Sequence, residues 1–301
     1  MAFDPPRSLS PSKVTSFTNC ALAFRFRAID HLPEPSSPQM VKGTLVHAAL
    51  ERLFWFHDRG SRSAAAARAE LSAAWDALQS DPEYRSLGLT GDQSAAFLAD
   101  AARLVDNYLL LEDPDGVEAV GVELMLETRF DGLRLRGIID RLDRTPDGGL
   151  VVIDYKTGRA PSAAHQQSRL VGVHLYALLC QEVLGQRPVE VRLLHLQEPT
   201  VIAARPTEQS VRGQRQRTAA LWSAIERSCE REDFRPKTSP LCNYCHFQEY
   251  CPAFGGDPAA ATAAGAGAAG AGAGAAPTAA PAAGDEESTA GTPGLGALAG
   301  R

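Results

Sequence analysis

Two carboxylates and an amine lie close together in the sequence between Gly137 and Gly158. Asp140 lies in the middle of GIIDRLDR, a stretch in which apolar and charged residues alternate. Asp154 follows a short apolar run, and Lys156 comes two residues after it. Successive side chains of a strand point to opposite faces, so Asp154 and Lys156 share a face that an antiparallel neighbour can bring to Asp140. Carboxylates bind hard divalent cations, and an amine beside them can steady an attacking water or a phosphate oxygen. These residue types predict phosphodiester hydrolysis, against the simpler alternative of a hairpin with a solvated ion pair.

Consecutive strands must position these groups. The PDGG turn joins GIIDRLDR to the β-branched run LVVIDY, and an Asp-Gly pair at 131–132 joins residues 133–144 to an alternating stretch at 118–130. This pattern predicts a three-stranded antiparallel meander that ends at Asp154. Glu123 lies on the first strand and could face the carboxylates, but on an alternating strand a solvent-facing glutamate is expected.

The remaining segments predict helices and two further strands. The chain is expected to begin with a helix over 8–30, where Ser10 is the N-cap and Pro11 suits the first helical position. Further elements are expected as alanine-rich helices at 62–80 and 92–111, helices at 162–184 and 207–231, and strands at 189–197 and 201–204. This order predicts an α/β fold with helices around a small mixed sheet.

An amphipathic helix expected over 40–58 carries a histidine that could join the acidic group. His47 and Glu51 are four residues apart and therefore lie on one face of the helix. A lone histidine on a helix is usually structural or solvated, but the companion glutamate and the upstream Gly43 make His47 a candidate ligand. The core side of this helix is expected to consist of Leu50, Leu53, Phe54 and Phe56.

Four cysteines could form one further site. Cys242, Cys245 and Cys251 are spaced C-x2-C-x5-C, which leaves the group one ligand short, and Cys20 can complete it. Four thiolates bind either zinc or an iron–sulfur cluster. Such a site would join the two ends of the folded chain, and its expected role is structural.

Composition sets the remaining bounds. The 301 residues carry a net charge of −6, which neither supports nor excludes a nucleic-acid partner. The first residues contain no apolar signal region and no run is long enough to span a membrane, so a cytoplasmic protein without a membrane partner is expected. Cys180 and Cys229 lie within predicted helices and are expected to be buried. Residues 255–301, rich in Ala, Gly and Pro, are expected to be a disordered tail.

Four motifs in order resemble one family. They are LSPSKVTSFTNC, KGTLVHAALE, RGIIDRLD…VVIDYKTG and CNYCHFQEYC. Together they resemble the RecB-family exonucleases of the PD-(D/E)XK nuclease superfamily, in the iron–sulfur branch that includes the AddB nuclease domain and the CRISPR-associated adaptation nucleases. The resemblance covers about residues 8–254. It implies a restriction-endonuclease-like core in a nuclease domain over 1–254, with a helical insertion at about 60–112 and an iron–sulfur staple joining the N- and C-terminal segments.

The resemblance also implies roles for individual residues. His47, Asp140, Asp154 and the backbone carbonyl of Tyr155 would hold Mg²⁺ or Mn²⁺, and Lys156 would orient or activate the attacking water. Cys20, Cys242, Cys245 and Cys251 would hold a [4Fe–4S] cluster, with zinc as the alternative.

One position departs from the family's pattern. The family carries Gln-x3-Tyr in the helix after the lysine strand, but this chain has Gly172 four residues before Tyr176. His174, Gln166 or Gln167 could substitute for the missing glutamine, or its contact with DNA or the active site could be lost. Glu51, His174 and Tyr176 are therefore candidates for accessory roles.

The expected function is metal-dependent hydrolysis of DNA, with exonuclease action in repair or recombination. The alternative is a catalytically silent module that binds DNA ends or acts as a scaffold. DNA would be held through its phosphates, without base readout, and the candidate contacts are Arg25, Arg27, Arg136 and Arg141. No phosphate-binding loop of the G-x4-G-K-[ST] type occurs, so a separate helicase subunit is a candidate partner.

Overall fold

The computed structural model describes residues 3–160 and 166–262. The chain divides into two compact units, a larger one of Ser8–Ser12 and Pro35–Trp222, and a smaller one of Met1–Arg7, Lys13–Glu34 and Ser223–Arg301. The helices expected as an insertion at about 60–112 lie in the larger unit. Among the described residues, no helix is both long and apolar enough to cross a membrane.

The larger unit is built on a five-stranded sheet in the order β1-β2-β3-β4-β5. The strands are β1 (Ala119–Phe130), β2 (Leu133–Arg144), β3 (Leu150–Lys156), β4 (Glu190–His195) and β5 (Thr200–Ala204). β3 and β4 are parallel and the other pairs are antiparallel, which confirms the predicted meander and the mixed sheet. Asp131 and Gly132 both have positive φ, 49° and 74°, as the tight turn of a two-residue hairpin requires.

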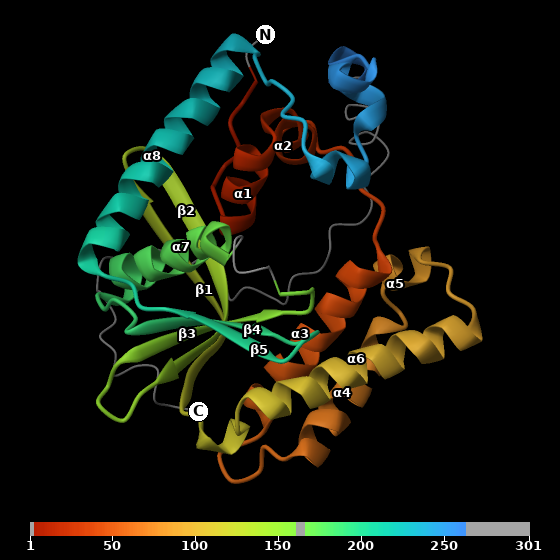
Figure 1. Ribbon diagram of the computed structural model, residues 1–301, viewed down its shortest axis with the longest axis vertical. Helices are drawn as coiled ribbons and strands as arrows, with labels where there is room; N and C mark the ends of the chain where they lie inside the picture. Colours follow the sequence, from red (N-terminus) through yellow and green to blue (C-terminus); the bar gives the residue numbers. More distant parts are fainter. Residues whose placement is uncertain (1–2, 161–165, 263–301) are drawn as a thin grey trace, which may run out of the picture. The chain divides into compact units, whose positions relative to one another are not determined.

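Helices cover both faces of this sheet (Figure 1). α7 (Gln166–Leu184) makes the crossover that the parallel pair β3–β4 needs, and it packs against β1 and β2. The expected start of this helix, 162–165, lies outside the described residues. The other face carries α3 (Pro38–Phe56), α4 (Ala64–Leu78) and α6 (Gly91–Leu111), whose apolar residues share one core with β3 and β4. The remaining helices are α5 (Pro82–Ser86) and α8 (Glu208–Arg231).

α3 is fixed at its start and along its core side. The Ser37 side chain accepts a hydrogen bond from the Met40 N–H, and Pro38 occupies the first turn. Leu50 and Leu53 are fully buried, as expected. The expectation for Phe56 was wrong, because its ring is 60% exposed. Phe56 is the last residue of the helix, so no further turn of α3 packs over it.

A buried ionic cluster lies between β2, β3 and the end of α6. The fully buried Arg141 donates hydrogen bonds to both oxygens of Asp143, at 2.8 and 2.9 Å, and lies 2.5 Å from Glu112. Its Nη1 also donates to the Tyr155 hydroxyl at 2.8 Å and to the Tyr108 hydroxyl at 3.1 Å. The expectation that Arg141 contacts DNA was therefore wrong, because its side chain is fully buried and hydrogen-bonded inside the fold. It braces Tyr155 instead.

Removing this arginine should destabilise the protein strongly. Arg141→Ala leaves Glu112 and Asp143 without their counter-charge, and breaking a buried ion pair in this way costs about 3–5 kcal/mol of unfolding free energy. Denaturant unfolding measures the change. Arg136→Ala on the same strand is the matched control, because Arg136 is exposed and its loss should cost less than about 0.5 kcal/mol. Equal stability of the two variants would contradict the structural role of the cluster.

In the smaller unit the predicted first helix is interrupted. α1 (Pro11–Asn19), which starts in the larger unit, ends before Cys20, and α2 (Ala21–Ala28) begins after it. Cys20 has φ −160° and ψ 111°, an extended conformation that no helix can contain. The expectation that Cys20 lies on a helix was therefore wrong. Cys20 instead lies in the one-residue break between α1 and α2.

Two further expectations are corrected in this unit. Arg25 is buried and pairs with Asp30 at 3.0 Å, so it is not a free DNA contact, and Arg27 pairs with Glu34. The segment 255–262, expected to be disordered, is described and partly helical, and Arg25 donates to the Thr262 hydroxyl at 2.6 Å. Gly256 permits this path, because a Cβ there would lie 2.2 Å from the Glu249 carbonyl oxygen. Residues 263–301 lie outside the described part of the chain.

Candidate metal and catalytic site

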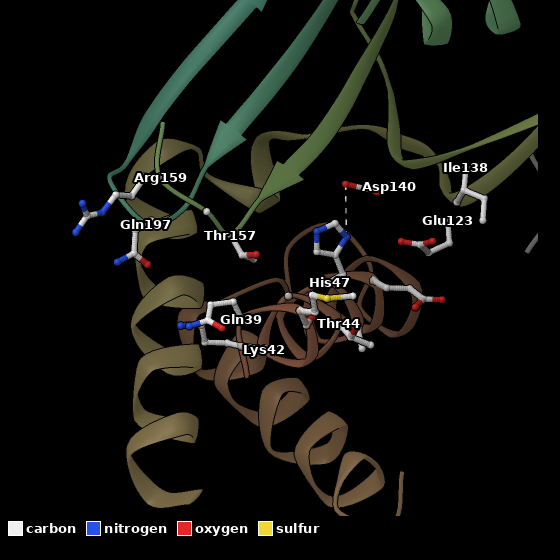
Figure 2. Close-up of a pocket in the computed structure, with 15 residues that line it drawn as sticks. Gln39, Lys42, Thr44, His47, Glu123, Ile138, Asp140, Thr157, Arg159 and Gln197 are labelled. Carbon is white, nitrogen blue, oxygen red and sulfur yellow. Dashed lines mark hydrogen bonds and ion pairs between the residues drawn. The ribbon is translucent and has the colours of Figure 1, made fainter. Parts of the chain in front are cut away.

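A cavity of about 900 Å³ opens in the larger unit where α3 meets the sheet. Its lining includes His47 and Glu51 from α3, Glu123 from β1 and Asp140 from β2. The segment that follows β3 closes one side with Thr157, Gly158 and Arg159. Figure 2 shows the His47 ring directed at Asp140, with Glu123 beside them and the other polar side chains across the hollow.

Three potential metal ligands converge in this cavity. His47, Glu123 and Asp140 each offer a ligand atom, and these atoms lie within 4.8 Å of one another. No other group of three His, Cys, Asp or Glu side chains in residues 3–160 and 166–262 meets that spacing. The expectation that Glu123 faces solvent was wrong, because β1 departs from regular geometry at this residue. Glu123 has φ +45°, rare for a residue with a side chain, and the pairing of β1 with β2 shifts register just before it.

The two carboxylates are crowded and partly desolvated. Burial raises the pKa of Glu123 to about 7, with the charges of Asp140 and Glu51 adding to the shift. Burial also raises the pKa of Asp140 to about 6, where His47 acts in the opposite direction and Asp154 adds to the rise. Carboxylates held together at this cost are stabilised by a cation. The mixed oxygen and nitrogen donor set therefore fits a divalent ion.

The backbone of β3 lies against His47 and Asp140 of this group. The Tyr155 N–H donates to Asp140 Oδ2 at 2.7 Å, and the Tyr155 carbonyl oxygen lies 3.1 Å from His47 Nε2. His47 Nδ1 lies 3.6 Å from Asp140 Oδ2. Neighbouring ligands around a six-coordinate Mg²⁺ are about 3 Å apart, given its bond lengths of 2.0–2.1 Å. The carbonyl and the carboxylate face different nitrogens of the ring, so an ion bound to either nitrogen has one of these two oxygens at about ligand spacing.

Asp154 and Lys156 lie on one face of β3, as their spacing predicted. Asp154 is 4% exposed, and its Oδ2 forms an ion pair with the half-exposed Lys156 ammonium. Tyr176 on α7 donates to Asp154 Oδ1 at 3.3 Å. Gly137 on β2 allows this approach, because a Cβ there would lie 2.7 Å from the Leu179 side chain on the same helix. Asp154 is therefore held between an amine and a phenol.

The other accessory candidates are distributed differently. Glu51 lines the cavity one turn after His47. His174 is partly buried, and its pKa is lowered by burial and by the charge of Arg217 on α8. No contact between His174 and Asp154 is found among the described residues. A Cβ at Gly172 would meet nothing within 4 Å. The side chains of Gln166 and Gln167 lie outside the described part of the structure.

A polar rim on the far side of the cavity was missed in the sequence. Lys42 on α3 forms an ion pair with Asp100 on α6, and Arg103 connects Asp100 with the Gln197 amide oxygen, which it approaches at 3.1 Å. Arg159 is exposed beside them. The signal was present in the motifs, because Lys42 opens KGTLVHAALE and Arg159 follows DYKTG. These residues place positive charge next to the ligand group.

If Glu123 is a ligand, its amide variant should bind metal poorly. Glu123→Gln keeps the shape of the side chain but removes its charge, and we expect the affinity for Mn²⁺ to fall by at least about tenfold. Isothermal titration with Mn²⁺ measures this directly. Glu127→Gln on the same strand is the control, because Glu127 is engaged with Arg134 at 2.7 Å, away from the ligand group. An unchanged Mn²⁺ affinity in Glu123→Gln would show that Glu123 is not a metal ligand.

The cysteines of the smaller unit line a second cavity, of about 270 Å³. Cys20, Cys242, Cys245 and Cys251 all contribute to its wall. Backbone N–H groups point at two of the sulfurs: Lys237 N–H lies 3.5 Å from Cys20 Sγ, and Ser239 N–H lies 3.4 Å from Cys242 Sγ.

The two remaining cysteines are not part of this wall. Cys180 and Cys229 are buried in helices, as expected.

Comparisons with known proteins agree with this geometry. The sequence model of the PD-(D/E)XK nuclease superfamily matches residues 8–252. The Gene 69 protein of Mycobacterium phage D29 is 26% identical over 81% of this chain and 96% of its own length. A subunit of the ATP-dependent helicase/deoxyribonuclease of Streptococcus agalactiae is 28% identical over 65% of this chain, which spans only 19% of that relative.

A solved structure supports the fold. The crystal structure of a candidate exonuclease from Eubacterium rectale superposes with a TM-score of 0.50 over 79% of this chain and 87% of its own, at 10% identity. This likeness concerns the fold alone, and it confirms the expected α/β core of a mixed sheet flanked by helices. From residue 8 to residue 252, the chain belongs to the PD-(D/E)XK nuclease superfamily.

Proposed function

We propose that this protein is a metal-dependent deoxyribonuclease that hydrolyses phosphodiester bonds as an exonuclease. The observation that carries the proposal is the convergence of His47, Glu123 and Asp140 on one cavity. Asp154 and Lys156 do not line that cavity, but they pair with each other on the neighbouring strand, and their charges act on Asp140. A superfamily of nucleases supplies the reaction class. One relative is named as a subunit of a helicase/deoxyribonuclease, which supports DNA as the polymer that is cut.

In this proposal five groups share the role of metal ligand. His47, Asp140, Asp154 and the Tyr155 carbonyl hold the ion, as the family resemblance implies, and we add Glu123 to them. A bound Mg²⁺ or Mn²⁺ would polarise the scissile phosphate and lower the pKa of a water. The imidazole favours Mn²⁺ more than an all-oxygen site would.

The lysine acts on the developing charge. The Lys156 ammonium lies on the same face as Asp154 and is half-exposed, so it can reach a phosphate oxygen or the attacking water. A positive charge fixed there stabilises the transition state. Tyr176 orients the Asp154 carboxylate through its hydrogen bond. Arg136 and Arg159, which are exposed, are proposed to hold the DNA phosphates without reading bases.

The partner proposed for this nuclease is a separate helicase. The Streptococcus relative is named as a subunit of a helicase/deoxyribonuclease, and this chain corresponds to about a fifth of it. The chain itself contains no G-x4-G-K-[ST] motif. Unwinding by another subunit would present DNA ends to the cavity, in repair or recombination.

A nuclease assay separates this proposal from a silent DNA-end-binding scaffold. Purified protein is incubated with end-labelled single- and double-stranded DNA and Mn²⁺, beside Asp154→Ala and Lys156→Ala. We expect the wild type to shorten the labelled strands and both variants to be inactive. If wild type and variants bind DNA ends but are equally inert, the scaffold function is correct.

For the cysteine cavity we propose a [4Fe–4S] cluster with a structural role. A tetrahedral zinc site with Zn–S bonds of about 2.3 Å would draw four sulfurs to about 3.8 Å from one another. Among the described residues no three cysteine sulfurs lie within 4.8 Å of one another, so their present spacing is not that of a zinc site. The N–H groups directed at Cys20 and Cys242 are typical of iron–sulfur sites. Arg27, which lines the cavity, supplies a compensating positive charge.

Metal analysis tests this assignment. Protein prepared without oxygen is expected to be brown, to absorb broadly in the visible range and to contain iron and acid-labile sulfide. Cys251→Ser should lose the iron and the colour, because one ligand is missing. Cys180→Ala, which alters a buried cysteine elsewhere, should retain both. A colourless, zinc-loaded wild-type protein from the same preparation would establish the zinc alternative.

A further inference from the structure

The side of α3 that carries His47 continues past the metal ligands into an aromatic surface. Thr44, Ala48, Glu51 and Trp55 recur at intervals of four, three and four residues, so they form one stripe along the helix. Thr44, Ala48 and Glu51 line the metal cavity. Trp55 stands at the end of the stripe with 67% of its surface exposed, and Phe56 beside it is 60% exposed.

These two rings wall a third hollow, of about 390 Å³, between α3 and α4. Ala74 and Ala77 of α4 contribute to its lining, and their small side chains leave space beneath the rings. The hollow shares Ala48 and Glu51 with the metal cavity, so the two depressions adjoin at these residues. A chain that leaves the metal ligands along α3 would reach the aromatic rings directly.

The Phe56 ring is held in place without being covered. The Arg52 guanidinium lies 4.9 Å from the centre of the Phe56 ring, and its Nε donates to Glu70 on α4 at 2.8 Å. Two large aromatic side chains exposed next to each other on a folded surface indicate a binding surface. Trp55 is the tryptophan that stands out, because Trp222 is buried and Trp75 packs against Tyr84 and Phe97.

We propose that Trp55 and Phe56 form a stacking platform for unpaired bases of a single DNA strand whose backbone enters the metal cavity. This inference rests on the proposed nuclease function and specifies its substrate. Exposed aromatic faces bind unpaired bases by stacking, irrespective of sequence, whereas the bases of a duplex are already stacked on each other. From His47 to Trp55 the helix rises by about 12 Å, so the stacked bases lie a few nucleotides from the bond that is cut. The substrate is therefore a single strand or a frayed end.

Binding measured without hydrolysis tests the platform. In an Asp154→Asn background, the affinity for a fluorescein-labelled oligothymidylate and for a blunt duplex of the same length is measured by anisotropy. Adding Trp55→Ala should weaken the binding of the single strand by at least about tenfold and leave the duplex affinity unchanged. Because stacking involves no ion release, the slope of affinity against salt should stay the same. Trp55→Phe should retain most of the affinity, and single strands should quench the fluorescence of Trp55.

A matched control and the contrary results complete the test. Leu110→Ala removes an equally exposed apolar side chain from α6, 75% exposed, and should not change binding. If Trp55→Ala binds the oligothymidylate as well as its parent, the platform does not exist, even if the wild type digests DNA. The platform is equally overturned if the substitution impairs only association with a protein subunit. If Trp55 supports single-strand binding but the wild type cleaves nothing, the platform stands and the nuclease function fails.

Discussion

Asp140→Asn is expected to lower the rate of DNA hydrolysis by at least about a thousandfold, the equivalent of about 4 kcal/mol of transition-state stabilisation. Asp140 Oδ2 accepts the Tyr155 N–H and lies beside both His47 and Glu123. The asparagine keeps a carbonyl oxygen for the Tyr155 N–H, so the strand pairing should survive. What it removes is the negative charge on which binding of the cation depends.

Single-turnover cleavage of end-labelled DNA at saturating Mn²⁺ measures this loss. The control is Asp131→Asn, the same chemical change in the turn between β1 and β2. Asp131 has φ +49°, a conformation that asparagine adopts readily, so this variant should fold and cleave normally. A rate for Asp140→Asn within tenfold of the wild type would mean that Asp140 is not needed for the chemistry.

Lys156→Ala is expected to lower kcat by about a hundredfold to a thousandfold, the range seen when one charge-stabilising donor is removed from an active site. The lysine ammonium pairs with Asp154 and is not a metal ligand. Its loss should therefore leave Mn²⁺ affinity intact, or increase it by removing a competing cation from the Asp154 carboxylate. Lys156→Arg should restore part of the rate, because it returns a positive charge with a different reach.

Separate measurements of kcat and of Mn²⁺ affinity distinguish this role from that of a ligand neighbour. A slow variant with normal metal binding supports charge stabilisation in the transition state. A variant that binds Mn²⁺ weakly, but reaches the wild-type kcat when saturated, would show that the lysine serves only to order the site.

Local sequence patterns predicted the sheet, which the structure confirms, and most of the residues in the proposed ligand group. Alternation and the Asp-Gly turn defined β1 and β2, and the apolar run before Asp154 defined β3, because strand periodicity and turn chemistry act over a few residues. The four-residue spacing of His47 and Glu51 correctly placed both on one side of α3. Family resemblance supplied what spacing could not, namely which of these residues belong together.

The errors arose where distant parts of the chain determine a conformation. Glu123 is turned into the cavity by a positive φ and a register shift, and the sole local sign of irregularity was Gly121, a weak strand residue. Arg141 resembles a surface arginine in an alternating strand, but Glu112 and Tyr108, on a helix far away in sequence, enclose it. Cys20 breaks a helix whose apolar spacing is continuous. None of these contacts leaves a periodic signal.

The strand segment that carries this site is held by a buried ionic cluster, unlike the residues of a surface ion pair. Tyr155 contributes its carbonyl to the ligand group on one side and its hydroxyl to Arg141 on the other. The buried cluster therefore fixes the strand segment from which Asp154 and Lys156 project. Preorganisation of this kind limits how far the ligands can move when a cation leaves.

The location of Mn²⁺ in crystals of the protein tests the central claim most directly, because anomalous scattering identifies the metal without reference to activity. We predict an anomalous peak within bonding distance of His47, Asp140 and the Tyr155 carbonyl oxygen, with Glu123 or Asp154 completing the protein ligands. A cleavage-competent protein whose only bound Mn²⁺ lies away from these side chains would contradict the account.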